Sequence, residues 1–238
     1  MTVNFATIDK LIEEGFLMDS RFNSPAEIAS LVSKSGVTKS MLSLPKMILL
    51  GLMAGAFIAF GGAASDVAMH GVADVGLARV VAGVIFPVGL MLVVFTGSEL
   101  FTGNCLMIIP TLEKKIKVAS MLRNLVVVYI SNFVGAMIID LLITFSGQLN
   151  YSNGGLGAFT IKVALAKTTI NPATAIISGI LCNILVCLAI VMATGATDAI
   201  GKIFGVFFPI CAFVVCGFEH CVANMFYIPI GVMAAMNP

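Results

Sequence analysis

Residues 217–224 read GFEHCVAN and place a carboxylate, an imidazole and an amide inside an apolar run from Ile203 to Met236. This run is too long for one span, because a straight transmembrane helix needs only ~20 apolar residues. Two half-helices joined by a break at membrane depth fit it better, and such backbone is tolerated only inside protein or beside a cavity. Ionisable side chains at that depth are costly and mark functional sites. The break is therefore the first candidate site.

A second copy of the pattern lies earlier in the chain. Residues 97–104 read GSELFTGN and repeat the spacing Gly-x-Glu-x-x-x-x-Asn within an apolar run from Arg79 to Pro110. The segments that lead into the two breaks also agree, with GVIFP at 83–87 and GVFFP at 205–209. Interrupted apolar segments in corresponding positions of two halves indicate the binding site of a repeat-built transporter. Chance similarity is the alternative, and the shared glutamate and asparagine disfavour it because polar residues are rare in membrane segments.

Composition places the chain in the class of polytopic membrane proteins. Hydrophobic residues make up 59% of it, charged residues 11%, and the mean hydropathy is +1.08. The net charge of +1 and the absence of a basic stripe predict no nucleic-acid partner. The six cysteines all lie in apolar runs and are expected to be reduced and buried. No phosphate-cradling loop or paired metal-ligand spacing occurs, so no cofactor and no metal are predicted.

The distribution of basic residues orients the chain. Ten lysines and arginines fall on the side of the N-terminal segment and three on the other, so the positive-inside rule places the N-terminus in the cytoplasm. Residues 1–46 are predicted to form a cytoplasmic amphipathic segment. Its first helix would cover Phe5–Leu17, and a second would begin at Ser24 and Pro25, a capping residue followed by proline at the first helical position. Anchoring and gating of a pore are both open as roles.

Residues 47–238 are predicted to form one transmembrane channel domain. Its first repeat, about 47–145, holds a span, a broken span and a span, so the second repeat, about 172–238, starts on the opposite side and is inverted. By this logic a further span covers the second break, and we expect the natural chain to continue beyond Pro238. The unbroken spans are expected over Met47–Ala64, Leu125–Phe145 and Pro172–Thr194, with loops over Asp66–Ala78 and Gly147–Asn171.

The two interrupted stretches, ELFTGN at 99–104 and GFEHCVANM at 217–225, resemble the signature loops of the formate/nitrite transporter family. Its members include formate, nitrite and hydrosulfide channels, and the resemblance covers residues 1–236. It implies an all-α membrane protein with an aquaporin-like inverted repeat of six helices, of which the sixth is missing here. It also implies that each subunit has its own pore and that a homopentamer lies in the lipid bilayer of the inner membrane.

The resemblance also assigns roles to individual residues. The substrate pathway would contain His220 as its central protonatable group, Thr102, Asn183 and, in an outer vestibule, Lys167. Because a carboxylate facing a small anion would repel it, the two glutamates of the breaks are expected to brace the half-helices with their asparagines. These loop-bracing residues are Glu99, Asn104, Glu219 and Asn224. The apolar constrictions map onto Phe86, Leu90, Leu100, Phe101 and Phe213.

The predicted function is that of a channel for small monovalent anions of weak acids, with formate first and nitrite or hydrosulfide as alternatives. Lys167 would attract the anion, apolar rings would strip its water, and His220 would lend a proton. A neutral-solute pore for water or ammonia is the alternative of a different class. An enzyme is disfavoured, because no nucleophile with a paired base occurs. A buried structural His220 and a merely solvated Lys167 are the plainer interpretations of those two residues.

Overall fold

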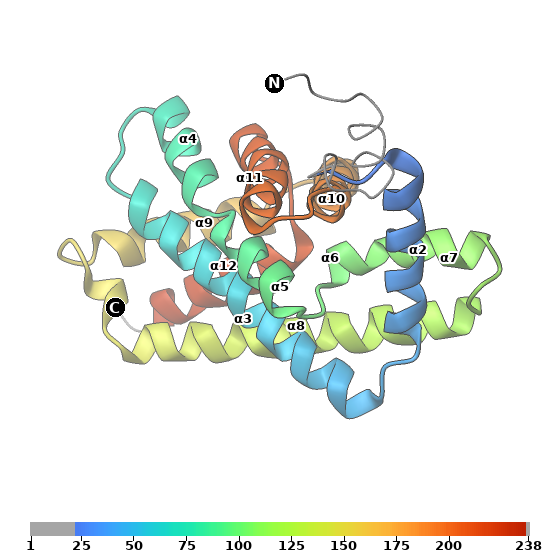
Figure 1. The fold of residues 1–238 in the computed structure, drawn as a ribbon. Coiled ribbons are helices and arrows are strands. Elements are labelled where there is room, and N and C mark those ends of the chain that lie inside the picture. The colour runs from blue at the N-terminus through green and yellow to red at the C-terminus, as the bar shows by residue number, and fades with distance from the viewer. Residues whose placement is uncertain (1–21, 237–238) are drawn as a thin grey trace, which may run out of the picture.

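The computed structural model describes residues 22–236, and that range is almost entirely helical. Figure 1 shows one bundle in which α3 packs beside α8 and α10 beside α11. The helices are α2 (Pro25–Ser40), α3 (Leu44–Met69), α4 (Val75–Ile85), α5 (Val88–Thr96), α6 (Phe101–Asn104), α7 (Ile108–Leu112), α8 (Val118–Phe145), α9 (Gly155–Thr168), α10 (Pro172–Gly195), α11 (Ala199–Cys216) and α12 (Cys221–Met236), with 3₁₀ turns η1 (Cys105–Met107) and η2 (Gln148–Asn150).

Five helical stretches of the described residues are long and apolar enough to cross a membrane. Two shorter apolar helices, Phe101–Leu112 and Cys221–Met236, follow the second and the fifth of these stretches. Residues 97–100 and 217–220 between them are not helical. The prediction of an all-α membrane protein with two broken transmembrane helices is thereby confirmed. The five stretches are Leu44–Met69, Val75–Thr96, Val118–Phe145, Pro172–Gly195 and Ala199–Cys216.

The first halves of both broken spans start and stop with the same local signals. Asp74 caps α4 by accepting a hydrogen bond from the Leu77 N–H at 2.7 Å, and Asp198 caps α11 through the Gly201 N–H at 2.8 Å. Each segment then ends at a glycine in the left-handed region, with φ of +70° at Gly97 and +73° at Gly217. Only glycine adopts this conformation without steric cost, so both helices end where the sequence repeat places the breaks.

Helices α3 and α8 approach each other closely through glycines. A Cβ built at Gly55 would lie 2.0 Å from the backbone oxygen of Asn132, and one at Gly135 would lie 2.0 Å from that of Leu52. Small residues allow helix backbones in membranes to pack in this way. The contact brings α8 over the first break, where the side chain of Asn132 forms hydrogen bonds with the backbone.

Two short helices each pack against the second half of a broken span. Gly36 of α2 faces the Pro110 ring, which would lie 2.7 Å from a Cβ built at Gly36. Gly231 of α12 faces Ala164 of α9, whose Cβ would lie 2.3 Å from a Cβ built at Gly231. In Figure 1, α2 is the blue helix beside α6 and α7. It begins as predicted: Ser24 and Glu27 form a reciprocal capping box ahead of the proline. The predicted helix over Phe5–Leu17 lies outside the described residues.

Two loop predictions are wrong. Helix α3 continues to Met69, so Asp66 is helical and the connection to α4 covers only residues 70–74. The polar pair Ser65 and Asp66 suggested a loop, but both are buried against neighbouring helices. The stretch Gly147–Asn171 contains α9, so Lys167 lies in the last turn of a helix. Packing of Leu156 and Ala164 stabilises α9 despite its weak apolar pattern.

Candidate functional site

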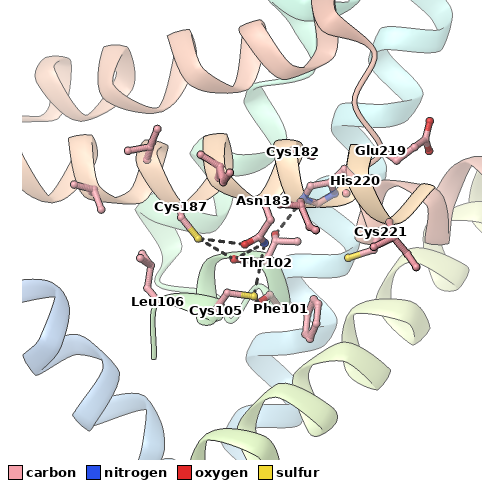
Figure 2. A pocket seen from close by; sticks show the side chains of 16 residues that line it. Phe101, Thr102, Cys105, Leu106, Cys182, Asn183, Cys187, Glu219, His220 and Cys221 are labelled. Carbon is pink, nitrogen blue, oxygen red and sulfur yellow. Dashed lines mark hydrogen bonds between the residues drawn. The ribbon is translucent and has the colours of Figure 1, made fainter. Parts of the chain in front are cut away.

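The two breaks meet at His220 and Thr102, which are 4% and 3% exposed. His220 Nε2 lies 3.0 Å from Thr102 Oγ1, and His220 Nδ1 accepts a hydrogen bond from the Ala223 N–H at 2.9 Å. Because a backbone N–H can only donate, the neutral ring carries its proton on Nε2 and donates it to Thr102. A proton added at Nδ1 would replace the Ala223 bond with a donor–donor contact. Figure 2 shows the hydrogen bond between His220 and Thr102.

Aromatic rings lie against His220. The Phe213 ring stacks on the imidazole with a centroid separation of 5.7 Å and an interplanar angle of 15°, and Phe86 contacts Phe213 edge-on at 5.7 Å. Phe101, next to Thr102, makes an edge contact with Tyr129 at 4.9 Å. Leu90 and Leu100 are both 2% exposed and belong to the hydrophobic core. The five predicted constriction residues therefore fall into an aromatic group at His220, one ring beside Thr102, and two core leucines.

Lys167 and Glu219 form an ion pair beside the second break. The ammonium group of Lys167 donates to both carboxylate oxygens of Glu219, at 2.8 and 2.9 Å. Asn224 Nδ2, in the first turn of α12, donates to Glu219 Oε2 at 2.8 Å. The Lys167 ammonium also lies 5.6 Å from the centre of the Tyr227 ring, within cation–π range. The positive charge of Lys167 is thus balanced locally, by a carboxylate that faces it.

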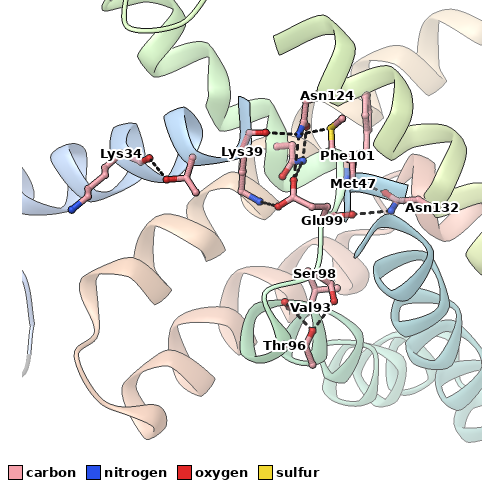
Figure 3. Close-up of polar contacts among 12 residues, drawn as sticks. Lys34, Lys39, Met47, Val93, Thr96, Ser98, Glu99, Phe101, Asn124 and Asn132 are labelled. Atoms are coloured by element: carbon pink, nitrogen blue, oxygen red, sulfur yellow. Dashed lines mark hydrogen bonds and ion pairs between the residues drawn. The ribbon is translucent and has the colours of Figure 1, made fainter. Parts of the chain in front are cut away.

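The first break carries a matching set of three residues. Lys39 of α2 pairs with Glu99 Oε1 at 2.5 Å, and Asn104 Nδ2 donates to Glu99 Oε2 at 2.7 Å (Figure 3). Asn124 of α8 adds a fourth polar side chain, because its Oδ1 accepts from Asn104 at 2.8 Å. A lysine from a short helix therefore holds the glutamate of each break, and an asparagine five residues later holds its second oxygen.

Amide side chains satisfy the backbone of the breaks. Asn132 Oδ1 accepts from the Phe101 N–H at 2.9 Å, while its Nδ2 donates to the Glu99 carbonyl at 2.9 Å and the Gly51 carbonyl at 2.8 Å. Asn183 Nδ2 donates to the Thr102 carbonyl at 3.1 Å. At the second break, the Glu219 N–H donates to Ser178 Oγ at 2.9 Å. Non-helical backbone in a membrane needs such partners.

Two cavities reach the site from different directions. A largely apolar groove of about 920 Å³ runs along α10 and reaches Thr102, Asn183 and His220. The second cavity, of about 630 Å³, lies between α4, α9, α11 and α12, and we call it the α9 vestibule. Its floor includes Phe86, Phe213 and His220, and its wall includes Lys167 and Glu219. His220 and Glu219 thus line both cavities.

Sequence reasoning missed several of these polar partners. Lys39 could be found only once the Lys167–Glu219 pair was known, because the repeat then predicts an equivalent cation at Glu99. Asn132 was visible as a polar residue in a span but carried no assigned role. Asn124 and Ser178 gave no signal, because a single polar residue near a helix end is common. Their functions depend on how α8 and α10 pack on the breaks.

A polar contact outside the membrane-spanning segments fixes α2 to the loop after α7. Ser33 Oγ donates a short hydrogen bond to the Glu113 carboxylate, and Lys115 pairs with the same carboxylate at 2.9 Å. The Ser33 hydrogen bond, followed by the Lys115 contacts, lowers the pKa of Glu113 below its ordinary value of 4.5. The negative charge of Glu113 therefore contributes to docking of α2 at neutral pH.

The fold and the site together define a polytopic membrane protein of the aquaporin-like inverted-repeat class, with polar groups held at two helix breaks. Within that class, the family model of the formate/nitrite transporter matches residues 26–237, and the chain belongs to that family. A probable formate transporter of Methanothermobacter thermautotrophicus is 42% identical over an alignment of 233 positions, which covers 90% of this chain and 85% of that protein. A formate channel of Bacillus thuringiensis is 41% identical, over 87% of this chain and 80% of its own length.

Solved structures agree with this assignment. A pentameric formate channel with formate bound superposes with a TM-score of 0.73 and 33% identity, over 79% of this chain and 75% of that one. An ion channel of the same family superposes with a TM-score of 0.79 and 28% identity, over 87% and 84% of the two chains. The resemblance seen in the two signature stretches is thereby confirmed along most of the chain.

Proposed function

We propose that the protein is a channel for small monovalent anions of weak acids, with formate as its main substrate. The observation that carries this proposal is the hydrogen bond from His220 to Thr102, which leaves the Thr102 hydroxyl as a free donor beside Phe86 and Phe213 at the meeting point of the two breaks. An anion that leaves water needs such donors, because an unpaired charge in an apolar site is very costly. The family membership and the named formate channels among its relatives support the choice of substrate.

Each residue has a definite task in this scheme. The hydroxyl of Thr102, which accepts from His220, donates its own proton to the anion. The N-terminal ends of α6 and α12 at the breaks add the positive end of their helix dipoles. The carboxylates of Glu99 and Glu219 are held by Lys39 and Lys167 and so brace the loops rather than repel substrate. Asn183 keeps the Thr102 carbonyl occupied, so this oxygen does not face the anion.

The protein would work as a homopentamer in the inner membrane, with one pore per subunit and the N-terminus in the cytoplasm. The α9 vestibule is then the outer entrance and the Lys39 side the inner one. The excess of basic residues on the Lys39 side supports this orientation. The pentameric assembly of a formate channel with the same fold supports the oligomeric state.

Flux measurements in proteoliposomes test the proposal. The purified protein is expected to carry formate faster than nitrite and hydrosulfide. Uptake should be faster at lower pH, because a higher proton concentration favours passage of the anion together with a proton. A Thr102→Val variant, which keeps the shape but removes the hydroxyl, should lose at least about tenfold of formate flux. Flux of water or ammonia without any flux of formate would contradict the proposal and favour a neutral-solute pore.

A further inference from the structure

The α9 vestibule contains positive charge that the proposed pathway does not use. Its lining includes the cations Arg79, Lys162 and Lys167 and the carboxylates Asp66 and Glu219. Lys167 is balanced by Glu219, which it contacts with both oxygens. Within residues 22–236, no ion pair involves Arg79 or Lys162. The anion attraction that the sequence assigned to Lys167 therefore has two stronger candidates, both with solvent-exposed side chains.

Arg79 is placed directly over the second break. Measured from a Cβ built at Gly217, its Nη1 lies at 3.4 Å and its Cζ and Nη2 at 3.5 Å. Gly217 ends α11 in the left-handed region, and His220 follows three residues later. The planar face of the guanidinium thus rests on the turn that leads to Glu219 and His220, and glycine leaves the space for it. Within the described chain, Lys162 of α9 forms no hydrogen bond or ion pair with the break.

Among residues 22–236, the first break has no equivalent of this arginine contact. Gly97 occupies the corresponding position with nearly the same φ, +70° against +73°. Apart from its chain neighbours, no atom of the described residues comes within 4 Å of a Cβ built there. The two lysine–glutamate–asparagine sets are matched between the breaks, whereas the arginine occurs at one of them. Its placement is therefore an addition to the repeat and not a consequence of it.

We propose that Arg79 is the anion-capture residue of the α9 vestibule, where a small carboxylate or similar oxyanion binds before it passes Phe86 and Phe213. This inference rests on the proposed function and names a residue that function did not include. A guanidinium offers parallel N–H donors in a fixed fork that matches a carboxylate, which an ammonium group does not. Lys162 contributes only long-range attraction.

Transport kinetics in proteoliposomes at low ionic strength test the role of Arg79. Arg79→Gln removes the charge and keeps polar hydrogens, and it should raise the KM for formate about fivefold with little change in maximal rate. Arg79→Lys keeps the charge without the fork and should lie between this variant and the wild type. Lys162→Gln is the matched control and should change KM less than about twofold, because it acts only at long range. An unchanged KM in Arg79→Gln would overturn the proposal.

Chemical modification gives a readout that does not need flux. Phenylglyoxal reacts with accessible arginines, and peptide mass spectrometry separates modification of Arg79 from that of Arg123, which lies on the α2 side and donates to the Leu42 carbonyl. Formate should slow modification of Arg79 and leave Arg123 unchanged. If wild-type proteoliposomes carry none of the three anions, the proposed function fails, and protection of Arg79 still decides whether the capture site exists. Equal modification of Arg79 with and without formate and nitrite would refute it.

Discussion

The hydrogen bonds of His220 give the imidazole two tasks at once. Its Nδ1 caps α12 through the Ala223 N–H, and its Nε2 donates to Thr102. The sequence led us to expect a proton-lending histidine, but both hydrogen bonds are satisfied by one neutral tautomer. We propose that this residue orients the hydroxyl of Thr102 and caps α12, and proton lending by His220 stays a prediction.

We predict that His220→Asn and His220→Leu behave differently. Asparagine is a strong capping residue whose oxygen can accept from the Ala223 N–H, and its amide can donate to Thr102, so formate flux and its pH dependence should persist within about threefold. Leucine makes neither contact, and loss of the cap alone costs about 1 kcal/mol. Its flux should fall at least about tenfold. Flux assays across pH decide, and loss of pH dependence in His220→Asn would show that the ring carries the proton.

Lys167 and Glu219 should depend on each other for stability. Their side chains are 19% and 12% exposed, so each charge left alone is poorly solvated, although less costly than a fully buried one. Lys167→Gln and Glu219→Gln should each lower the thermal unfolding temperature in detergent, and the double variant should recover at least half of the loss. Additive losses in the double variant would mean that the two residues do not interact. The equivalent pair, Lys39 and Glu99, is the natural comparison.

At the scale of helices, the crossing of α3 and α8 tolerates no added atoms. A methyl group at Gly55 would overlap the backbone of Asn132, whose side chain holds the first break. Gly55→Ala should therefore cost about 1–3 kcal/mol or more and reduce folded protein and flux together. Gly71→Ala is the control, since nothing lies within 4 Å of its Cβ position. Size-exclusion profiles and thermal unfolding measure the difference, and equal stability of the two variants would contradict the close packing.

The contact between α2 and the loop after α7 should weaken in acid. Because the pKa of Glu113 is lowered in the folded protein, its charge stabilises docking fully above the ordinary value of 4.5, and this contribution is lost as pH falls through the folded pKa. Amide exchange in α2 should accelerate below that pH in the wild type. Ser33→Ala removes the main cause of the shift and should flatten this pH dependence. The capping-box residue Glu27, whose pKa is also lowered by its hydrogen bonds with Ser24, is present in both proteins, so the difference between them reports on Glu113.

The parts of the fold that repeat were predictable, and the parts that depend on packing were not. Gly97 and Gly217 were recognisable as breaks because polar residues and glycine interrupted two similar apolar runs. Helix α9 was missed because its stability comes from α12, more than 50 residues later in the chain. The position of the site could be predicted from the break, but the hydrogen bonds and ion pairs within it could not. Asn132, Ser178 and Arg79 act through neighbours that only the fold brings close.

At the scale of the whole molecule, several apolar side chains of α10 face outward. Ile176, Ile177 and Ile180 are each more than half exposed in the described chain. Lipid or other protein must cover such a surface. If the proposed homopentamer forms, native mass spectrometry of the detergent-purified protein should give one species of about five times the mass of a single chain. A monomer that still carries formate would contradict the proposed assembly while leaving the proposed channel function intact.

Helix α2 has a further consequence for how the protein is made. It docks on Glu99 and Pro110 of the first repeat. Asn23, two residues before α2, donates from Nδ2 to the backbone carbonyl of Thr194 near the end of α10, 171 positions later. A ribosome therefore releases this segment long before its last partner exists. The contact between Asn23 and Thr194 can therefore form only after α10 has been made. Attachment of Asn23 to α10 is therefore expected to be a late step in the folding of the channel, after α10 has been inserted.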